Sequence, residues 1–70
     1  AADDGHKAAI LRFRASRRGL SMPPEVANYI VSRSPRALEH LLGQLDALDR
    51  ASLAEQRPLS IPFVKKVLGL

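Results

Sequence analysis

Five leucines in the middle of the chain constrain its fold more than any other feature of the sequence. Successive members are separated by three, one, three and three positions. The five are Leu38, Leu41, Leu42, Leu45 and Leu48. Steps of three and four residues bring side chains to one side of an α-helix. The stripe therefore predicts a long amphipathic helix, which we expect to be the spine of a helical core that continues toward Leu53.

Start and stop signals predict another helix before this one. The carboxylates of Asp3 and Asp4 suit the amino end of a helix, where unpaired N–H groups and the helix dipole favour negative charge. Gly19 suits the carboxyl end, because glycine adopts the left-handed conformation that often ends a helix. We therefore expect a first helix that begins after the two aspartates and stops at Gly19, with Ile10 and Phe13 as its apolar anchors.

Prolines and serines mark the beginnings of the other helices. A second helix is expected over residues 23–33, because proline is well tolerated in a first helical turn. Ser34 and Pro35 have the residue types of an N-cap and a first helical position, and they predict the start of the leucine-lined helix. Ser60 predicts the cap of a short fourth helix. No segment has the alternating pattern of a strand.

Length and composition fit one small all-α domain, a four-helix bundle that takes up residues 1–70. The chain has 70 residues, of which 46% are hydrophobic. It has no cysteine, which excludes disulfides and cysteine-based zinc sites, and we expect no metal. It has no apolar run long enough for a membrane span and no signal peptide. These features predict a soluble, cytoplasmic protein.

The net charge of +4 leaves several kinds of partner open. Four arginines gather at the end of the first predicted helix, and they are Arg12, Arg14, Arg17 and Arg18. They are either a solvated helix end that complements the dipole or a docking patch for DNA or an acidic partner. A free-standing DNA-binding module is one alternative, although Arg36 and His40 are its only candidate base contacts. A helical interaction domain with another partner is a second alternative.

Arg36 stands near the predicted start of the leucine-lined helix, where the helix dipole disfavours a cation. An exposed arginine tolerates this position without any function. A guanidinium beside free N–H groups is also an arrangement that binds phosphate. The spacing by itself leaves both interpretations open.

From Lys7 to Leu70 the chain has an Arg-Gly-Leu turn, the segment Pro-Glu-Val-Ala and an Arg-x-Leu-Glu sequence at the head of the long helix. With these features it resembles the carboxy-terminal lid of the DnaA family of AAA+ proteins. The segments LDRASL and IPFVKK are most similar to the Hda branch of that family. The resemblance implies a small all-helical AAA+ lid packed beside a nucleotide site.

The resemblance also implies roles for particular residues. Arg36 falls where this family places the sensor-II arginine, which reaches the phosphates of the bound nucleotide. The nucleotide would be ADP or ATP in the full-length parent, and no cofactor is expected for the isolated chain. The chain has no GxxxxGK[ST] motif. We therefore expect a non-enzymatic fragment of a longer AAA+ protein.

Partners follow from the same resemblance. The lid is expected to contact the AAA+ core of its parent, and DnaA or another AAA+ subunit. Arg12, Arg14, Arg17 and Arg18 are the candidate interface residues. A sliding clamp would bind only through a segment absent from this chain. Neither a membrane nor nucleic acid is an expected partner for this domain alone.

Overall fold

Four α-helices form the secondary structure of the part of the chain that the structure describes. A computed structural model describes residues 3–34 and 37–70. The helices are α1 (Asp3–Arg17), α2 (Pro24–Arg33), α3 (Leu38–Glu55) and α4 (Ile61–Leu68). These two ranges contain no strand, and none of their helices is long and apolar enough to cross a membrane. The expectation of an all-α four-helix bundle is confirmed.

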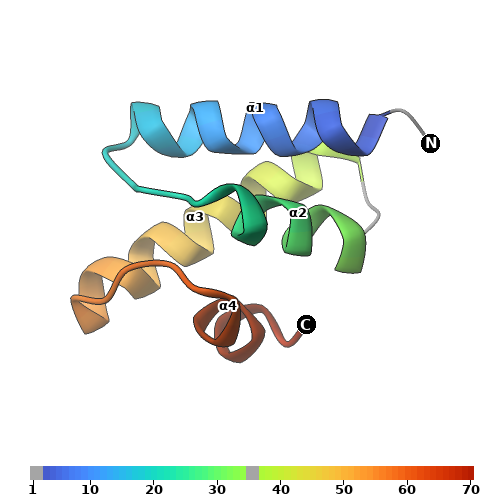
Figure 1. The fold of residues 1–70 in the computed structure, drawn as a ribbon. Helices are drawn as coiled ribbons and strands as arrows, with labels where there is room; N and C mark the ends of the chain where they lie inside the picture. Colours follow the sequence, from blue (N-terminus) through green and yellow to red (C-terminus); the bar gives the residue numbers. More distant parts are fainter. Residues whose placement is uncertain (1–2, 35–36) are drawn as a thin grey trace.

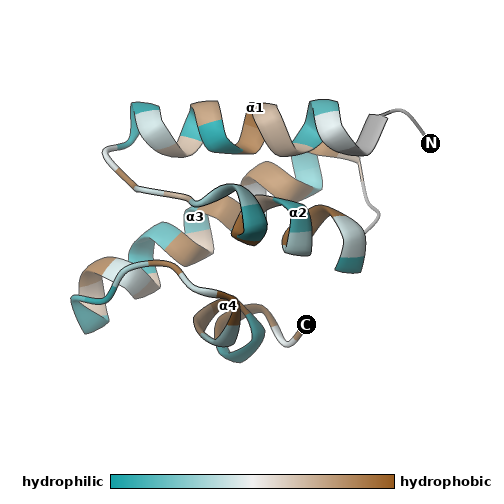
Figure 2. Cartoon of the chain, viewed as in Figure 1, coloured by the Kyte–Doolittle hydropathy of each residue, from teal (hydrophilic) through white to brown (hydrophobic). Residues whose placement is uncertain are grey.

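The helices surround one apolar core. α1 packs most extensively against α2 and also contacts α3, while α4 contacts both α2 and α3 (Figure 1). Polar and apolar segments alternate along the helices, as expected when only one side of each helix is buried (Figure 2). The largest fully buried side chains are Leu11, Val26, Ile30, Leu41, Leu45, Leu48 and Val64.

The buried side of α1 differs from the predicted one. Ala8, Leu11 and Ala15 enter the core, whereas Ile10 is half-buried and Phe13 is 60% exposed. Phe13 follows Leu11 by two residues, which places it about 200° around the helix. The prediction that Phe13 anchors the core is therefore wrong. Ala8 and Ala15 lie on the same side of the helix as Leu11, and α1 packs more extensively against α2 than against α3.

The end of α1 is confirmed at Gly19. The Gly19 N–H donates to the carbonyl of Ser16 at 3.0 Å, and the Leu20 N–H donates to the carbonyl of Ala15 at 2.9 Å. Gly19 has a φ of 74°, in the left-handed region. This pair of bonds is the Schellman motif, which satisfies carbonyls at the end of the helix. The buried Leu20 and Ala15 make the apolar contact that often accompanies it.

The start of α3 differs from the prediction. The N-cap of α3 is Ala37, and the helix begins at Leu38 rather than after Ser34. Ser34 ends the preceding helix instead, because its N–H donates to the carbonyl of Ile30 at 2.9 Å. Its side chain is therefore not the cap of α3, and the predicted first helical residue, Pro35, lies outside the described residues.

The leucine stripe of α3 is confirmed as the spine of the core. Leu41, Leu45 and Leu48 are almost completely buried, and Leu42 is partly buried. The stripe stops before Leu53, which is 73% exposed. The core therefore covers α3 as far as Ala51, which is partly buried against it, and the last turn extends beyond it.

The fourth helix follows its sequence signals closely. The hydroxyl of Ser60 accepts a hydrogen bond from the Phe63 N–H at 3.3 Å, so Ser60 is the N-cap as predicted. Phe63 and Val64 are buried against α2 and α3. The cap and the apolar pair thereby fix both the start of α4 and the side that faces the core.

Candidate functional site

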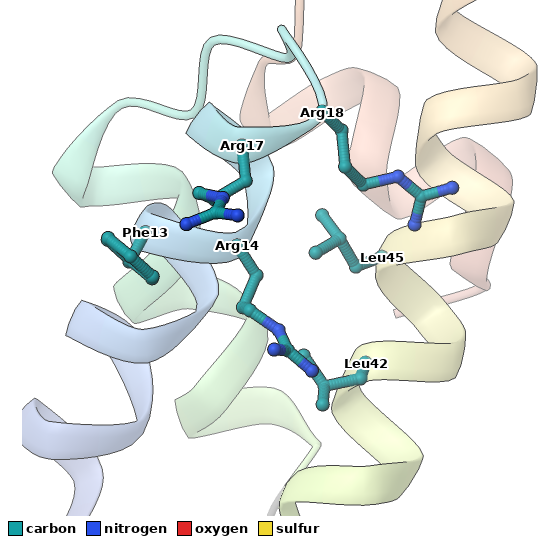
Figure 3. Close-up of a pocket in the computed structure, with 6 residues that line it drawn as sticks. All are labelled: Phe13, Arg14, Arg17, Arg18, Leu42 and Leu45. Atoms are coloured by element: carbon teal, nitrogen blue, oxygen red, sulfur yellow. The ribbon is translucent and has the colours of Figure 1, made fainter.

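A pocket of about 320 Å³ lies between the carboxyl-terminal half of α1 and the middle of α3 (Figure 3). Its floor is apolar, because the nearly buried Leu45 and the partly buried Leu42 project from α3 toward α1. Its remaining lining residues come from α1 and the turn that follows it: Phe13, Arg14, Arg17 and Arg18. The pocket therefore has an apolar floor and a basic wall.

Arg18 is held to α3 by two carboxylates. Its Nη2 lies 2.6 Å from Oδ1 of Asp46, and its Nε lies 3.0 Å from Oδ2 of Asp49. The second oxygen of Asp46 pairs with Nε of Arg50 at 3.1 Å. The positive charge of Arg18 is thus compensated within the domain, and the three side chains connect the end of α1 to the middle of α3.

The pairing shifts the protonation equilibria of both partners. The hydrogen bond from Arg18 is the main reason that the pKa of Asp46 lies below its ordinary value, and Arg50 lowers it further against the opposing effect of desolvation. The hydrogen bond to Asp46 likewise raises the pKa of Arg18. Both groups therefore stay charged at neutral pH.

Arg14 and Arg17 have no carboxylate partner among the described residues. The guanidinium of Arg17 instead lies 5.8 Å from the ring centroid of Phe13, a cation–π distance. Figure 3 shows the guanidinium of Arg14 extending along the pocket toward Leu42. The basic wall therefore carries two uncompensated positive charges beside an exposed aromatic ring.

Arg12, the fourth arginine of the predicted cluster, lines a different pocket. Its Nε donates to the carbonyl of Met22 at 3.4 Å. That second pocket is lined by Arg12, Ser16, Gly19, Leu20, Ser21 and Met22. The structure therefore brings Arg14, Arg17 and Arg18 together in one pocket and places Arg12 in another.

The predicted phosphate contact, Arg36, lies outside the described residues. The described neighbourhood begins with the N-cap Ala37, which makes no side-chain cap hydrogen bond, and the first turn of α3 carries Glu39. Within residues 3–34 and 37–70, no three histidine, aspartate or glutamate side chains gather as metal ligands would.

Sequence reasoning missed the partners of Arg18. Asp46 and Asp49 are three residues apart on α3, a spacing that places them on one side of the helix and is also typical of a solvated surface. No local pattern indicates which charge on α1 reaches them. The apolar side of α1 did carry a signal, since Ala8, Leu11 and Ala15 have spacings of three and four residues that match a buried helical face.

Comparisons with known proteins identify the family. The family model described as "Hda, lid domain" matches residues 4–68. An uncharacterized protein from Haemophilus influenzae is 45% identical over 67 residues, which are 96% of this chain and 29% of that protein. The chain belongs to the Hda lid-domain family, which confirms the resemblance found in its sequence.

Proposed function

We propose that this chain is the lid of an AAA+ regulator of bacterial replication initiation that acts in the cytoplasm. In this proposal, the lid closes over ADP or ATP bound by the ATPase core of the parent protein. The family match over residues 4–68 is the observation that carries the proposal. In this proposal the ATPase core of the parent hydrolyses the nucleotide. The lid contacts the nucleotide and covers it when it closes.

Arg36 is the residue that we propose to contact the nucleotide. In sequence it precedes by two positions the first residue of α3, Leu38. The N-cap Ala37 has no side chain able to occupy the helix amino end, and free N–H groups there attract anions. A guanidinium remains charged and binds phosphate oxygens through two parallel hydrogen bonds. Its loss would remove both charge and directional bonding.

Contact with DnaA or another AAA+ subunit is the second part of this proposal. Arg14 and Arg17 support it, because they are uncompensated within the described residues. Arg18 supports it indirectly, since its ion pairs with α3 hold the end of α1 in place. Exposed cations on a folded surface guide and orient an acidic partner.

Replacing Arg36 in the full-length protein tests the nucleotide contact. We expect Arg36→Ala to weaken the binding of a fluorescent ADP analogue by about tenfold or more, because a hydrogen bond to a charged group contributes about 1.5–3 kcal/mol. Arg36→Lys should retain part of the affinity. Arg33→Ala is a matched control, since it removes the same kind of side chain and Arg33 is an exposed arginine that stacks on Tyr29. Equal affinities for Arg36→Ala and Arg33→Ala would contradict the assignment.

A further inference from the structure

We propose that the pocket between α1 and α3 binds a short segment of a partner protein that carries an apolar side chain flanked by carboxylates. The pocket is the one lined by Phe13, Arg14 and Arg17 on one side and by Leu42 and Leu45 on its floor. This inference does not depend on Arg36 or on a bound nucleotide, and it names the chemistry that the partner must present.

Phe13 and the floor of Leu42 and Leu45 form the apolar part of the proposed binding surface. Phe13 and Leu53 are the two large hydrophobic side chains that are strongly exposed in the described residues, and only Phe13 borders this pocket. A ring that is 60% exposed can bury substantial apolar area when a partner covers it. An aliphatic or aromatic side chain seated over Leu42 and Leu45 would cover the floor and one edge of the ring.

The charged half comes from Arg14 and Arg17. Neither has a carboxylate partner among the described residues, so each can donate charge-assisted hydrogen bonds to an incoming carboxylate. The cation–π contact with Phe13 holds the guanidinium of Arg17 beside the ring. A single partner segment can therefore engage the ring and the guanidinium together.

Arg18 makes the pocket asymmetric. Its charge is compensated by Asp46 and Asp49, whereas the charges of Arg14 and Arg17 have no carboxylate partner within residues 3–34 and 37–70. Partner carboxylates should therefore pair with Arg14 and Arg17 rather than with Arg18, and an apolar group should cover the floor formed by the two leucines. The reverse orientation would place the partner carboxylates beside Arg18, whose charge is already compensated, so they would gain less attraction there.

The same asymmetry favours an acidic peptide over nucleic acid. At the Arg18 end of the pocket, a phosphodiester backbone would find the guanidinium already paired with Asp46 and Asp49. The floor of Leu42 and Leu45 offers an apolar side chain a site and offers phosphate none. Binding of DNA is therefore an alternative result of the test.

The test uses the 70-residue chain, whose four helices enclose their own core. The probe is a fluorescein-labelled peptide of sequence EDDLFEEDG, and its binding is followed by fluorescence anisotropy. We expect saturable binding that weakens by about tenfold or more in Phe13→Ala and in Arg14→Glu, because central aromatic and arginine contacts dominate such interfaces. Lys65→Glu is the matched control, since this exposed lysine on α4 undergoes the same change of charge.

Several results would overturn the proposal. The first is no binding of the peptide to the wild-type chain, and the second is an equal loss of affinity in Lys65→Glu and Arg14→Glu. A third is unchanged binding when the peptide's leucine and phenylalanine are replaced by serine, since charge alone would then suffice. A fourth is tighter binding of a short duplex DNA that is lost in Arg14→Glu. Circular dichroism checks each fold, and Arg17→Glu replaces Phe13→Ala if that variant loses helix.

Discussion

Arg18 and its neighbour Arg17 differ in electrostatic environment although both are exposed arginines at one helix end. Arg18 reaches two aspartates on α3, while Arg17 stacks on Phe13. A charge that is compensated inside the domain contributes to holding two helices together. A charge without a partner is free to attract one from outside. At the residue scale, these two arginines therefore have different roles: Arg18 connects two helices, and Arg17 can attract a partner.

Acidification should weaken the connection between Arg18 and Asp46. The pKa of Asp46 is lowered in the folded state, chiefly by the hydrogen bond from Arg18. A lowered pKa contributes stability that is present above the ordinary value of 3.8 and is lost as the pH falls through the folded value. When the pH is lowered from about 6 to about 2.5, we expect the melting temperature to fall less in Asp46→Asn than in the wild type.

Glu25→Gln provides the control for this measurement. Glu25 is an exposed carboxylate that forms no ion pair within the described residues. Glu25 lies in the first turn of α2, where a negative charge favours the helix, and its glutamine variant keeps the pairing of Arg18 with Asp46. Its melting temperature should therefore still fall as that pairing is lost on acidification. Parallel pH dependence of Asp46→Asn and the wild type would show that this pairing contributes nothing measurable to folding.

Helix ends and helix interiors make opposite demands on glycine in this chain. Gly19 ends α1 with a positive φ of 74°. Residues with a Cβ adopt this backbone conformation only at a cost in free energy. Gly43 lies inside α3, is exposed, and has open space around the position of a Cβ. At the scale of the element, Gly19 therefore stabilises the end of α1, whereas Gly43 reduces the stability of α3.

Alanine at these two positions should shift stability in opposite directions. Gly43→Ala should raise the free energy of unfolding by up to about 1 kcal/mol, because alanine is the better helix former. Gly19→Ala should lower it by about 1 kcal/mol, because alanine is strained in the left-handed region. Urea denaturation of the two variants measures both changes. A gain in stability for Gly19→Ala would contradict the described end of α1.

One core serves all four helices, and the chain is close to the smallest size that folds alone. The buried side chains come from every helix and from the links before α2 and α4, where Leu20, Met22 and Leu59 enter the core. A domain of this size has only a small free energy of unfolding. At the scale of the whole molecule, loss of one central side chain should therefore be severe.

Leu41→Ala and Leu53→Ala test this with the same chemical change. Leu41 is fully buried, whereas Leu53 is 73% exposed on the same helix. Leu41→Ala should lower the free energy of unfolding by about 2–5 kcal/mol, because it removes buried apolar contacts and leaves a cavity. Leu53→Ala should change it by less than about 0.5 kcal/mol. Similar losses in both variants would contradict the placement of α3.

Local sequence patterns predicted most of the fold. The leucine stripe of α3, the glycine that ends α1 and the capping Ser60 each act over a few residues. Their effects depend on helix periodicity and on nearby N–H and carbonyl groups, so they are encoded locally. The number of helices, the all-α class and the family resemblance follow from such patterns. Ser34 shows their limit, because one serine can stand at either of two neighbouring helix ends.

The chemistry of the candidate site was decided by tertiary structure. Phe13 could be core or surface until the packing of α1 on α2 selected Leu11 for the core. Arg18 could be free or paired until α3 brought Asp46 and Asp49 within reach. The sequence by itself determined the helices and their order. Burial and charge compensation depend on distances between helices, and those distances exist only once the four helices have packed around their core.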